Sequence, residues 1–427
     1  MTLEIHVPIA TPARATHSQL APSATELSKS GRRAVWASLI SVLFLSQIAY
    51  NINTFPASTD LICYAAVTAY LLISGFASIG ILSLALFVAA LLMACFGTAT
   101  ATSSTSWTSL MLLFVLYAPF AIRLKGEPEG AHEYVLSAYV SAATCIACIA
   151  IVQIVLVNAT KSALLTNIYF TLPEAIRGAG RYTFLREGGG IIKPNGFFLR
   201  ESADLSLVVA LALLIEFGSR ARLRVMGILA AGLLCSLSGT GLLAITAGFL
   251  LPRSLLRIPL FIVYLVGLIL GLYLLYSLGI PGLDLWFDRL SEFQTPNTSA
   301  YARFVAPMEM IGHSLDNGPL ATWFGNGAGS YLRDVQLYHM NYEVNDPTWA
   351  KLIYEYGVLG FVLIFAILAQ RLYSSRLRIE ICNFLMFSWI SVGVVLKPSF
   401  ALIVWLLTLV GQSASRPTTQ RAGPRAG

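Results

Sequence analysis

The chain has 427 residues and a formal net charge of +7; 56% of its residues are hydrophobic and only 11% are charged. Soluble globular proteins are about one-quarter charged, so this composition excludes a soluble domain and indicates a polytopic membrane protein. The apolar residues form continuous runs of about 20 residues without the alternation of a barrel strand, which predicts membrane-spanning helices. The excess positive charge lies in short loops and therefore requires no nucleic-acid partner.

The apolar runs predict an all-α bundle of about twelve transmembrane helices. Residues 1–33 are polar and are expected to be disordered in the cytoplasm, residues 34–412 to form the helical bundle, and residues 413–427 to form a cytoplasmic tail. The predicted helices lie near residues 34–50, 61–78, 80–97, 108–123, 134–157, 203–218, 225–238, 239–252, 258–280, 352–370, 380–396 and 398–412.

The distribution of basic residues predicts the orientation of these helices. Every second connection is positive, beginning with "KSGRR" before the first helix and continuing with Arg220, Arg222 and Arg224. The short connections "NINTFPASTD" and "TATATSSTSWTS" carry no lysine or arginine. Because basic residues stay on the cytoplasmic side, both termini are expected in the cytoplasm.

Two connections are far longer than the others, and both are predicted on the outer face. They run from about residue 158 to 201 and from about 281 to 350; ordered loops of this length are usually functional. The first loop is basic although it lies outside. Its cations are either solvated side chains or a binding site for an anionic ligand, since the planar guanidinium group matches phosphate oxygens.

The second long loop contains amphipathic stretches and a glycine-rich turn, "WFGNGAGSYLRD". Glycines in such a cluster more often permit tight turns than bind phosphate. Aromatic residues are frequent in both loops, which is typical of an interfacial belt and is also compatible with stacking on sugar rings.

Four segments carry a resemblance to a known group of proteins. They are "KPNGFFLRES" at residues 193–202, "SLSGTGLLAITAGFLL" at 236–251, "YARFVAPMEMIGHSLDNGPLATWFGNGAGSYL" at 301–332 and "NDPTWAKLIYEYGVLG" at 345–360. Their order and predicted sidedness resemble the bacterial O-antigen ligase and Wzy-type O-antigen or exopolysaccharide polymerase superfamily. The N-terminal third of the chain matches only as generic membrane helices.

The resemblance implies an inverting glycosyltransferase of the bacterial inner membrane that needs neither cofactor nor metal. Such an enzyme transfers a glycan from undecaprenyl diphosphate to a sugar hydroxyl of another lipid-linked repeat unit on the periplasmic face. The implied partners are an undecaprenyl-diphosphate-linked oligosaccharide and the lipid bilayer, with a chain-length regulator and a flippase as further candidates.

The site residues expected from this resemblance are cations for the diphosphate and a base for the hydroxyl. Arg303 leads the catalytic candidates. In the ligase branch a histidine stands eleven residues before the glycine of the closing helix, and this position is Asp346 here, so Asp346 is either the base or a helix cap; His339 is the substitute candidate. The candidate diphosphate-binding residues are Lys193, Arg200, Arg186, Arg181 and Arg177.

Two other functions fit the same pattern. One is a ligase that transfers the finished glycan to another acceptor. The other is a polysaccharide transporter or flippase, which would favour charges buried within the helices. Glu216 is the nearest to such a charge, and the sequence predicts it at the cytoplasmic end of its helix. The sequence therefore favours the polymerase.

Overall fold

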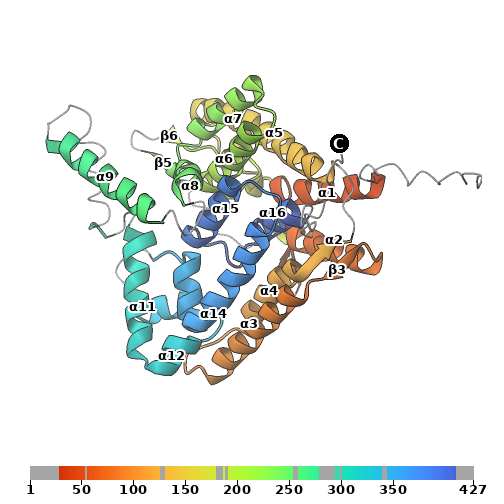
Figure 1. The fold of residues 1–427 in the computed structure, drawn as a ribbon. Helices are drawn as coiled ribbons and strands as arrows, with labels where there is room; N and C mark the ends of the chain where they lie inside the picture. The colour runs from red at the N-terminus through yellow and green to blue at the C-terminus, as the bar shows by residue number, and fades with distance from the viewer. Residues whose placement is uncertain are drawn as a thin grey trace, which may run out of the picture.

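The computed structural model describes residues 28–52, 55–125, 130–178, 186–187, 191–252, 258–277, 294–296, 298, 301–338 and 344–409. The described chain is a bundle of helices (Figure 1). Its α-helices are α1 (Lys29–Leu43), α2 (Thr59–Ile73), α3 (Ile81–Thr100), α4 (Trp107–Tyr117), α5 (Ala131–Thr160), α6 (Ser202–Gly218), α7 (Leu223–Cys235), α8 (Gly239–Leu250), α9 (Ile258–Ser277), α11 (Ala306–Asp316), α12 (Pro319–Phe324), α13 (Ser330–Leu337), α14 (Thr348–Tyr373), α15 (Ile379–Ser391) and α16 (Pro398–Leu409).

Each of the twelve predicted apolar windows overlaps one of these helices. Among the described residues, α3, α5 and α14 are long and apolar enough to cross a membrane, and several shorter apolar helices accompany them. The expectation of an all-α membrane protein is therefore confirmed in its coarse form.

Short elements supplement the helices. Three two-stranded antiparallel pairs join β1 (Ala49–Ile52) to β2 (Phe55–Ser58), β3 (Ala77–Ile79) to β4 (Ile122–Leu124) and β5 (Arg186–Glu187) to β6 (Ile191–Ile192). Single turns of 3₁₀-helix are η1 (Ala118–Ala121), η2 (Ala163–Leu165), η3 (Ile168–Phe170) and η4 (Glu174–Ile176), and a π-helical turn, η6 (Tyr301–Val305), precedes α11.

The interior of the bundle is organised around α16, which is buried on all sides from Ala401 to Leu409. A helix that is apolar all round is stable only where neighbours enclose it. Two buried tryptophans link the C-terminal helices to the α4–η1 segment: the indole of Trp405 donates to the carbonyl of Pro119 at 2.9 Å, and that of Trp389 donates to the Tyr117 hydroxyl at 2.7 Å.

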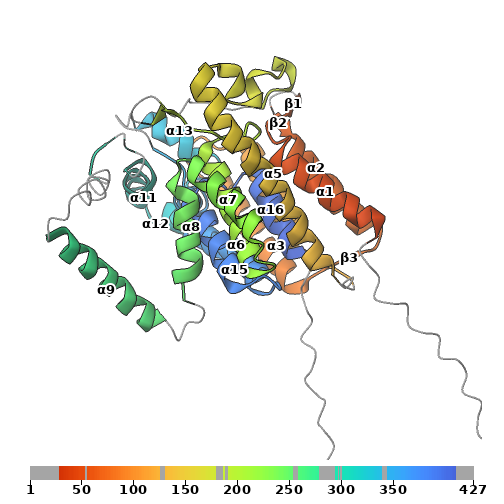
Figure 2. The same cartoon turned by 90° about the horizontal axis from the view of Figure 1, so that it is seen from above.

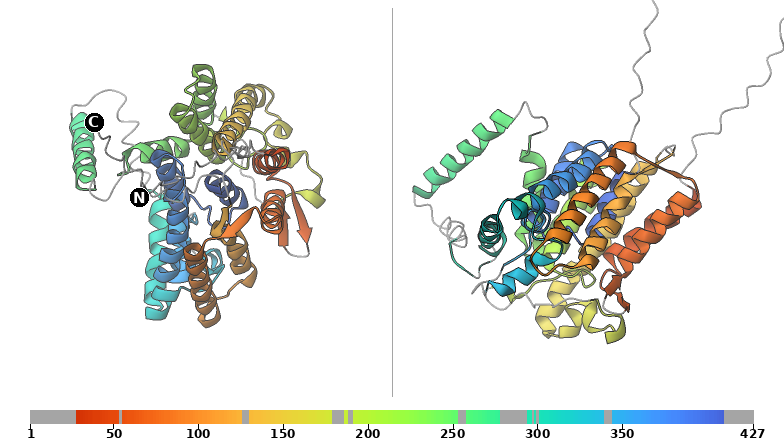
Figure 3. Two further views of the ribbon diagram at one scale, coloured as in Figure 1. Left: turned by 45° about the vertical axis from the view of Figure 1, so that its right-hand side comes forward. Right: turned by 90° about the horizontal axis from the view of Figure 1, so that it is seen from below.

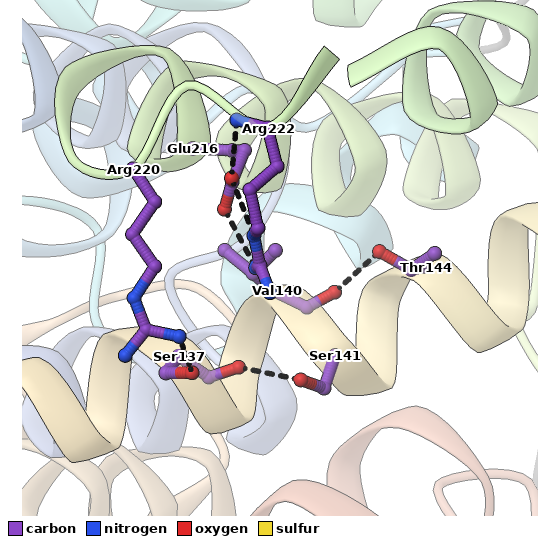
Figure 4. A network of polar contacts seen from close by, with 7 residues as sticks. All are labelled: Ser137, Val140, Ser141, Thr144, Glu216, Arg220 and Arg222. Carbon is purple, nitrogen blue, oxygen red and sulfur yellow. Dashed lines mark hydrogen bonds and ion pairs between the residues drawn. The ribbon is translucent and has the colours of Figure 1, made fainter. Parts of the chain in front are cut away.

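The bundle has two distinct ends. Figure 2 shows β1, β2 and the connection after α5 at one end and β3 at the other. At the β3 end, the buried carboxylate of Glu216 accepts two hydrogen bonds from the Arg222 guanidinium at 2.8 and 2.9 Å, and Arg220 donates to Ser137 on α5 (Figure 4). Glu216 therefore lies at the end of α6 that is remote from the two long connections.

Two pairs of consecutive helices, α7–α8 and α15–α16, are too short to cross a bilayer. Their helices have 12 or 13 residues, which corresponds to about 18–20 Å of the roughly 30 Å of hydrocarbon. The predicted window 380–396 was too long, because the backbone of residues 392–397 leaves the helix inside the bundle. Irregular backbone at this depth is stable only where protein buries it or it lines a cavity. In contrast, α9 stands apart from the other helices in both views of Figure 3.

Candidate functional site

The Pro-Asn-Gly turn of "KPNGFFLRES" is held inside the bundle by one glutamine of α5. The side-chain oxygen of Gln153 accepts from the backbone N–H groups of Asn195 and Phe197, both at 3.1 Å, while its amide nitrogen donates to the Asn195 side chain at 3.0 Å. The Asn195 amide in turn donates to the carbonyl of Leu199 at 2.8 Å. These contacts satisfy buried backbone groups that have no helical partner.

The geometry of this turn requires a glycine. Gly196 has φ +71°, and a Cβ there would lie 2.7 Å from Ile146 of α5. Phe197 also has a positive φ of 66°, and the next ring, Phe198, packs edge-on against Phe44 at 5.2 Å between centroids. The turn therefore fixes where α6 begins, and it places Arg200 directly before that helix.

A cavity of about 730 Å³ opens at this end of the bundle. Its walls include the starts of α2, α6 and α14, the π-helical turn η6, and the connection between α15 and α16. The charged residues that line it are Asp60, Arg200, Glu201, Asp204, Arg303, Asp346, Lys351 and Lys397.

Three of the predicted site residues, Arg200, Arg303 and Asp346, line this cavity together although up to 146 positions separate them in the chain. Lys193 is not part of its wall. Arg177 is also outside the wall, because its guanidinium donates to the Leu172 carbonyl at 2.7 Å and lies 5.3 Å from the ring centroid of Tyr169. Arg181, His339 and the side chain of Arg186 lie outside the described residues.

Arg303 reaches the cavity from η6 and differs from the other cations in its surroundings. It is partly buried, and its Nη1 lies 3.5 Å from the Thr240 hydroxyl at the start of α8. Among the described residues it makes no ion pair, whereas Arg200 lies 3.6 Å from Glu201 and both of those side chains are half exposed. A partly buried arginine without a carboxylate partner is suited to bind an anion, because its charge is not yet compensated.

Asp346 is paired with a lysine from the first turn of α14. The Nζ atom of Lys351 lies 2.8 Å from Asp346 Oδ2; the lysine side chain is 9% exposed and the aspartate side chain 33%. The lysine is thus almost enclosed, while the carboxylate remains accessible from the cavity. A carboxylate in this position can accept a proton from a hydroxyl group.

The sequence interpretation missed a second charged group in the cavity. Lys397, in the α15–α16 connection, forms an ion pair with Asp204 of α6, and Asp60 of α2 interacts electrostatically with the same lysine. All three residues fall inside or beside segments read as apolar spans. The available signal was the charge itself, since ionisable residues within membrane segments usually mark functional sites.

Buried charges also occur on α14, which corrects the expectation that Glu216 is the nearest example. Lys351, Glu355 and Arg371 are each less than 10% exposed. The guanidinium of Arg371 donates to Ile122 O at 2.6 Å and to Thr408 at 2.9 Å, and it joins helix ends remote from the cavity. Because such buried charges are present, the expectation that a transporter would require them no longer counts against a transporter here.

The glycine-rich turn after α12 serves packing. Helix α14 is kinked at Gly357, where φ is +69°, and the carbonyls of Tyr354 and Glu355 lose their helical partners. The backbone N–H groups of Asn326 and Gly327 donate to these carbonyls at 2.8 and 3.0 Å. The glycines of the turn permit this close crossing of two backbones. This agrees with the expectation that the glycine cluster permits a tight turn.

Tyr331 of α13 supports the same region. Its hydroxyl donates to the carbonyl of Asn345 at 2.9 Å, directly before Asp346. Burial raises the pKa of Tyr331 well above its ordinary value. The side chain therefore remains a hydrogen-bond donor at physiological pH and is unsuited to act as a base.

The cavity thus combines an arginine that has no ion-pair partner in the described part of the chain, a second arginine at the head of α6 and an accessible carboxylate. The family model described as WcaD colanic acid polymerase matches residues 37–413, which is most of the chain. No curated protein sequence matches the chain. The resemblance to exopolysaccharide polymerases is confirmed by the family match. The chain belongs to the WcaD colanic acid polymerase family and is a Wzy-type exopolysaccharide repeat-unit polymerase.

Proposed function

We propose that this polymerase transfers glycan from undecaprenyl diphosphate to a sugar hydroxyl of another lipid-linked repeat unit, in the cavity lined by Arg200, Arg303 and Asp346. The observation that carries the proposal is Arg303, a partly buried cation without an ion-pair partner among the described residues, facing the same cavity as an accessible carboxylate.

The reaction is a displacement at the anomeric carbon. The acceptor hydroxyl oxygen forms a bond to this carbon while the bond to the diphosphate oxygen breaks, and its electron pair leaves with the diphosphate. Attack from the face opposite the leaving group inverts the configuration. Arg303 and Arg200 stabilise the negative charge that grows on the leaving diphosphate, and such stabilisation favours the transition state over the ground state.

The proton of the acceptor hydroxyl passes to Asp346. A carboxylate held at the cavity wall can accept it as the new bond forms, which prevents a protonated ether oxygen from accumulating. The remaining candidates have other places in the proposal. Lys193 and Arg177 remain candidates for diphosphate binding outside the cavity wall. Arg181, Arg186 and His339 belong to connections whose side chains lie outside the described residues.

The same proposal places the cavity on the periplasmic side of the bacterial inner membrane. Twelve helices then connect two cytoplasmic termini, and the short helix pairs α7–α8 and α15–α16 end beneath the outer membrane surface. Support comes from the basic connections, which alternate along the chain as the positive-inside rule expects.

The test is polymerisation by the purified protein with lipid-diphosphate repeat units. Arg303→Ala should lower kcat/KM about 100-fold, as is usual for the loss of one group that stabilises transition-state charge. Arg303→Lys should retain part of the activity, because lysine keeps the charge but not the planar fork. Arg200→Ala should lower kcat/KM less, since Arg200 already has Glu201 beside it.

Arg333→Ala is the matched control, because Arg333 is exposed on α13 and donates to the Ser104 carbonyl outside the cavity wall. It should polymerise at the wild-type rate. Wild-type rates for Arg200→Ala, Arg303→Ala and Lys193→Ala together would exclude the proposed site. In a deletion strain, accumulation of single lipid-linked units supports the polymerase, whereas accumulation of long lipid-linked chains would indicate a ligase.

A further inference from the structure

The two oxygens of the Asp346 carboxylate have different surroundings. Oδ2 accepts from Lys351 Nζ at 2.8 Å, and among the described residues this is the only hydrogen-bond partner of the side chain. Oδ1 lies against Gly393: a Cβ built on Gly393 would be 2.9 Å from Oδ1 and 2.7 Å from the Asp346 backbone oxygen. Both Asp346 and Gly393 line the cavity. One oxygen is therefore tied to a cation, and the other faces a position where any side chain would crowd it.

The backbone around Asp346 is held from three directions. The N–H of Asn345 donates to the carbonyl of Ala302 in η6 at 3.0 Å, and the carbonyl of Asn345 accepts from Tyr331 of α13. On the other side, the Thr348 hydroxyl donates to the carbonyl of Val392 at 2.8 Å. The position of this segment is thus determined by η6, α13 and the α15–α16 connection together.

Lys351 is itself enclosed between two carboxylates of the same helix region. Glu355 follows one turn later on α14, is 1% exposed and interacts electrostatically with both Lys351 and Asp346. Tyr331 of α13 also interacts electrostatically with Asp346, and Arg303 from η6 and Lys397 from the α15–α16 connection line the same cavity. A lysine enclosed with two carboxylates keeps its charge and has little freedom to move.

We propose that Lys351 and Gly393 are positioning residues for Asp346: the lysine holds Oδ2 in place, and the glycine leaves Oδ1 as the oxygen that receives the acceptor proton. This inference rests on the proposed function, in which Asp346 is the base. In the step, the hydroxyl O–H bond breaks, an Oδ1–H bond forms, and the sugar oxygen bonds to the anomeric carbon as the diphosphate leaves.

The first test compares kcat and KM in two Lys351 variants. Lys351→Met removes the hydrogen-bond partner of Oδ2, so the carboxylate is free to turn and kcat should fall at least about tenfold while KM stays within about twofold. Lys351→Arg keeps a cation in reach of Oδ2 and should retain most of the wild-type kcat. A wild-type kcat for folded Lys351→Met would overturn the inference.

Lys351→Met also leaves the buried Glu355 without its cation, so this variant can lose stability for a reason unrelated to catalysis. The double variant Lys351→Met/Glu355→Gln removes the unpaired charge and provides a second measurement of kcat and KM. Its kcat should fall as in Lys351→Met, and a wild-type kcat contradicts the proposed role of the lysine. Lys161→Met, at an exposed lysine outside the cavity wall, is the matched control and should leave both constants unchanged.

The second test addresses the glycine. Gly393→Ala should lower kcat at least about tenfold while KM stays within about twofold, because the methyl group crowds both the backbone oxygen and Oδ1 of Asp346 and shifts the carboxylate. Gly312→Ala on α11 is its control, since a Cβ there has no neighbour within 4 Å. Wild-type kcat for Gly393→Ala would exclude the proposed contact.

Failure of this inference is distinguishable from failure of the proposed function. Asp346→Asn should abolish turnover while the thermal stabilisation of the protein by undecaprenyl diphosphate in detergent is retained. If Asp346→Asn is active, the assignment of the base itself is wrong. If Asp346→Asn is inactive but the Lys351 and Gly393 variants behave as wild type, only the positioning roles are wrong.

Discussion

Lys397 illustrates how single charges are accommodated at depth in this bundle. It stands at the end of the irregular segment between α15 and α16, and its side chain is 28% exposed, against 17% for its partner Asp204. Two charges this poorly hydrated are stable together, but either one alone is costly because its attraction to the partner is lost and its hydration is not regained. The ion pair therefore joins α6 to the start of α16 at the cavity floor.

Lys397→Met should destabilise the protein by about 1–2 kcal/mol, between the values for an exposed and a fully buried pair, because both side chains are partly exposed. Asp60 adds to the effect, since it interacts electrostatically with the same lysine. The measurement is thermal unfolding in detergent. Lys397→Met/Asp204→Asn should recover more than half of the loss, as expected for two residues that interact directly. A double variant whose loss equals the sum of both single losses would show that the two side chains act independently.

At this scale the sequence was informative where charges lie in the long connections. Arg200, Arg303 and Asp346 could be selected from their motifs, and the structure places all three in one cavity wall. Lys351 and Lys397 were overlooked: Lys351 lies at the start of the apolar helix α14, and Lys397 adjoins α16 and has a partner 193 residues away. Gln153 carried no signal either, since a glutamine in a membrane helix gains meaning only from the turn that it binds.

At the scale of elements, the crossing of α12 and α14 is the most demanding packing arrangement at the site. Gly357 has φ +69° and ψ −178°, and a Cβ there would lie 2.3 Å from the carbonyl of Trp323. Gly325 lies at the end of α12, in the backbone segment that crosses α14, and a Cβ there would lie 2.4 Å from the carbonyl of Glu355. Both positions exclude every residue with a side chain, so the kink and the glycine-rich turn depend on each other.

Gly357→Ala should therefore destabilise the protein by more than about 3 kcal/mol, since strain at a glycine-only conformation adds to a backbone clash. Thermal unfolding and the yield of monodisperse protein measure the loss. Gly227→Ala within α7 is the control, because a Cβ there meets nothing within 4 Å and alanine favours a helix. Equal stability of the two variants would show that α14 can straighten without the crossing.

Apolar runs located the helices correctly but did not fix their ends. The window near 398–412 contains α16, and the hydrophobicity of this segment alone is enough to locate the helix. Where the preceding helix stops is decided by tertiary contacts: α15 ends at Ser391, and the next residues bond to Thr348 through Val392 O and Val394 N. No local pattern in the chain encodes that partner, which lies 44 residues away.

At the scale of the whole molecule, the cavity and the Glu216–Arg222 pair occupy opposite ends of the bundle. Asp204 lines the cavity near the start of α6, and Glu216 lies at the far end of the same helix. The exposed residue Leu164 of η2 lies in the connection that follows α5, on the cavity side, whereas the exposed Ser219 follows α6 on the other. These two positions report which end of the bundle faces which compartment.

In a variant whose six native cysteines are replaced by serine or alanine, Leu164→Cys should react with a membrane-impermeant maleimide in cells with a permeabilised outer membrane. Ser219→Cys should react only after the inner membrane is opened, because the basic connections are expected to stay in the cytoplasm. Polymerisation by each variant is the control for a native fold. The reverse labelling pattern would place the arginines of the cavity in the cytoplasm, where a periplasmic repeat unit cannot reach them, and would require a different substrate for the site.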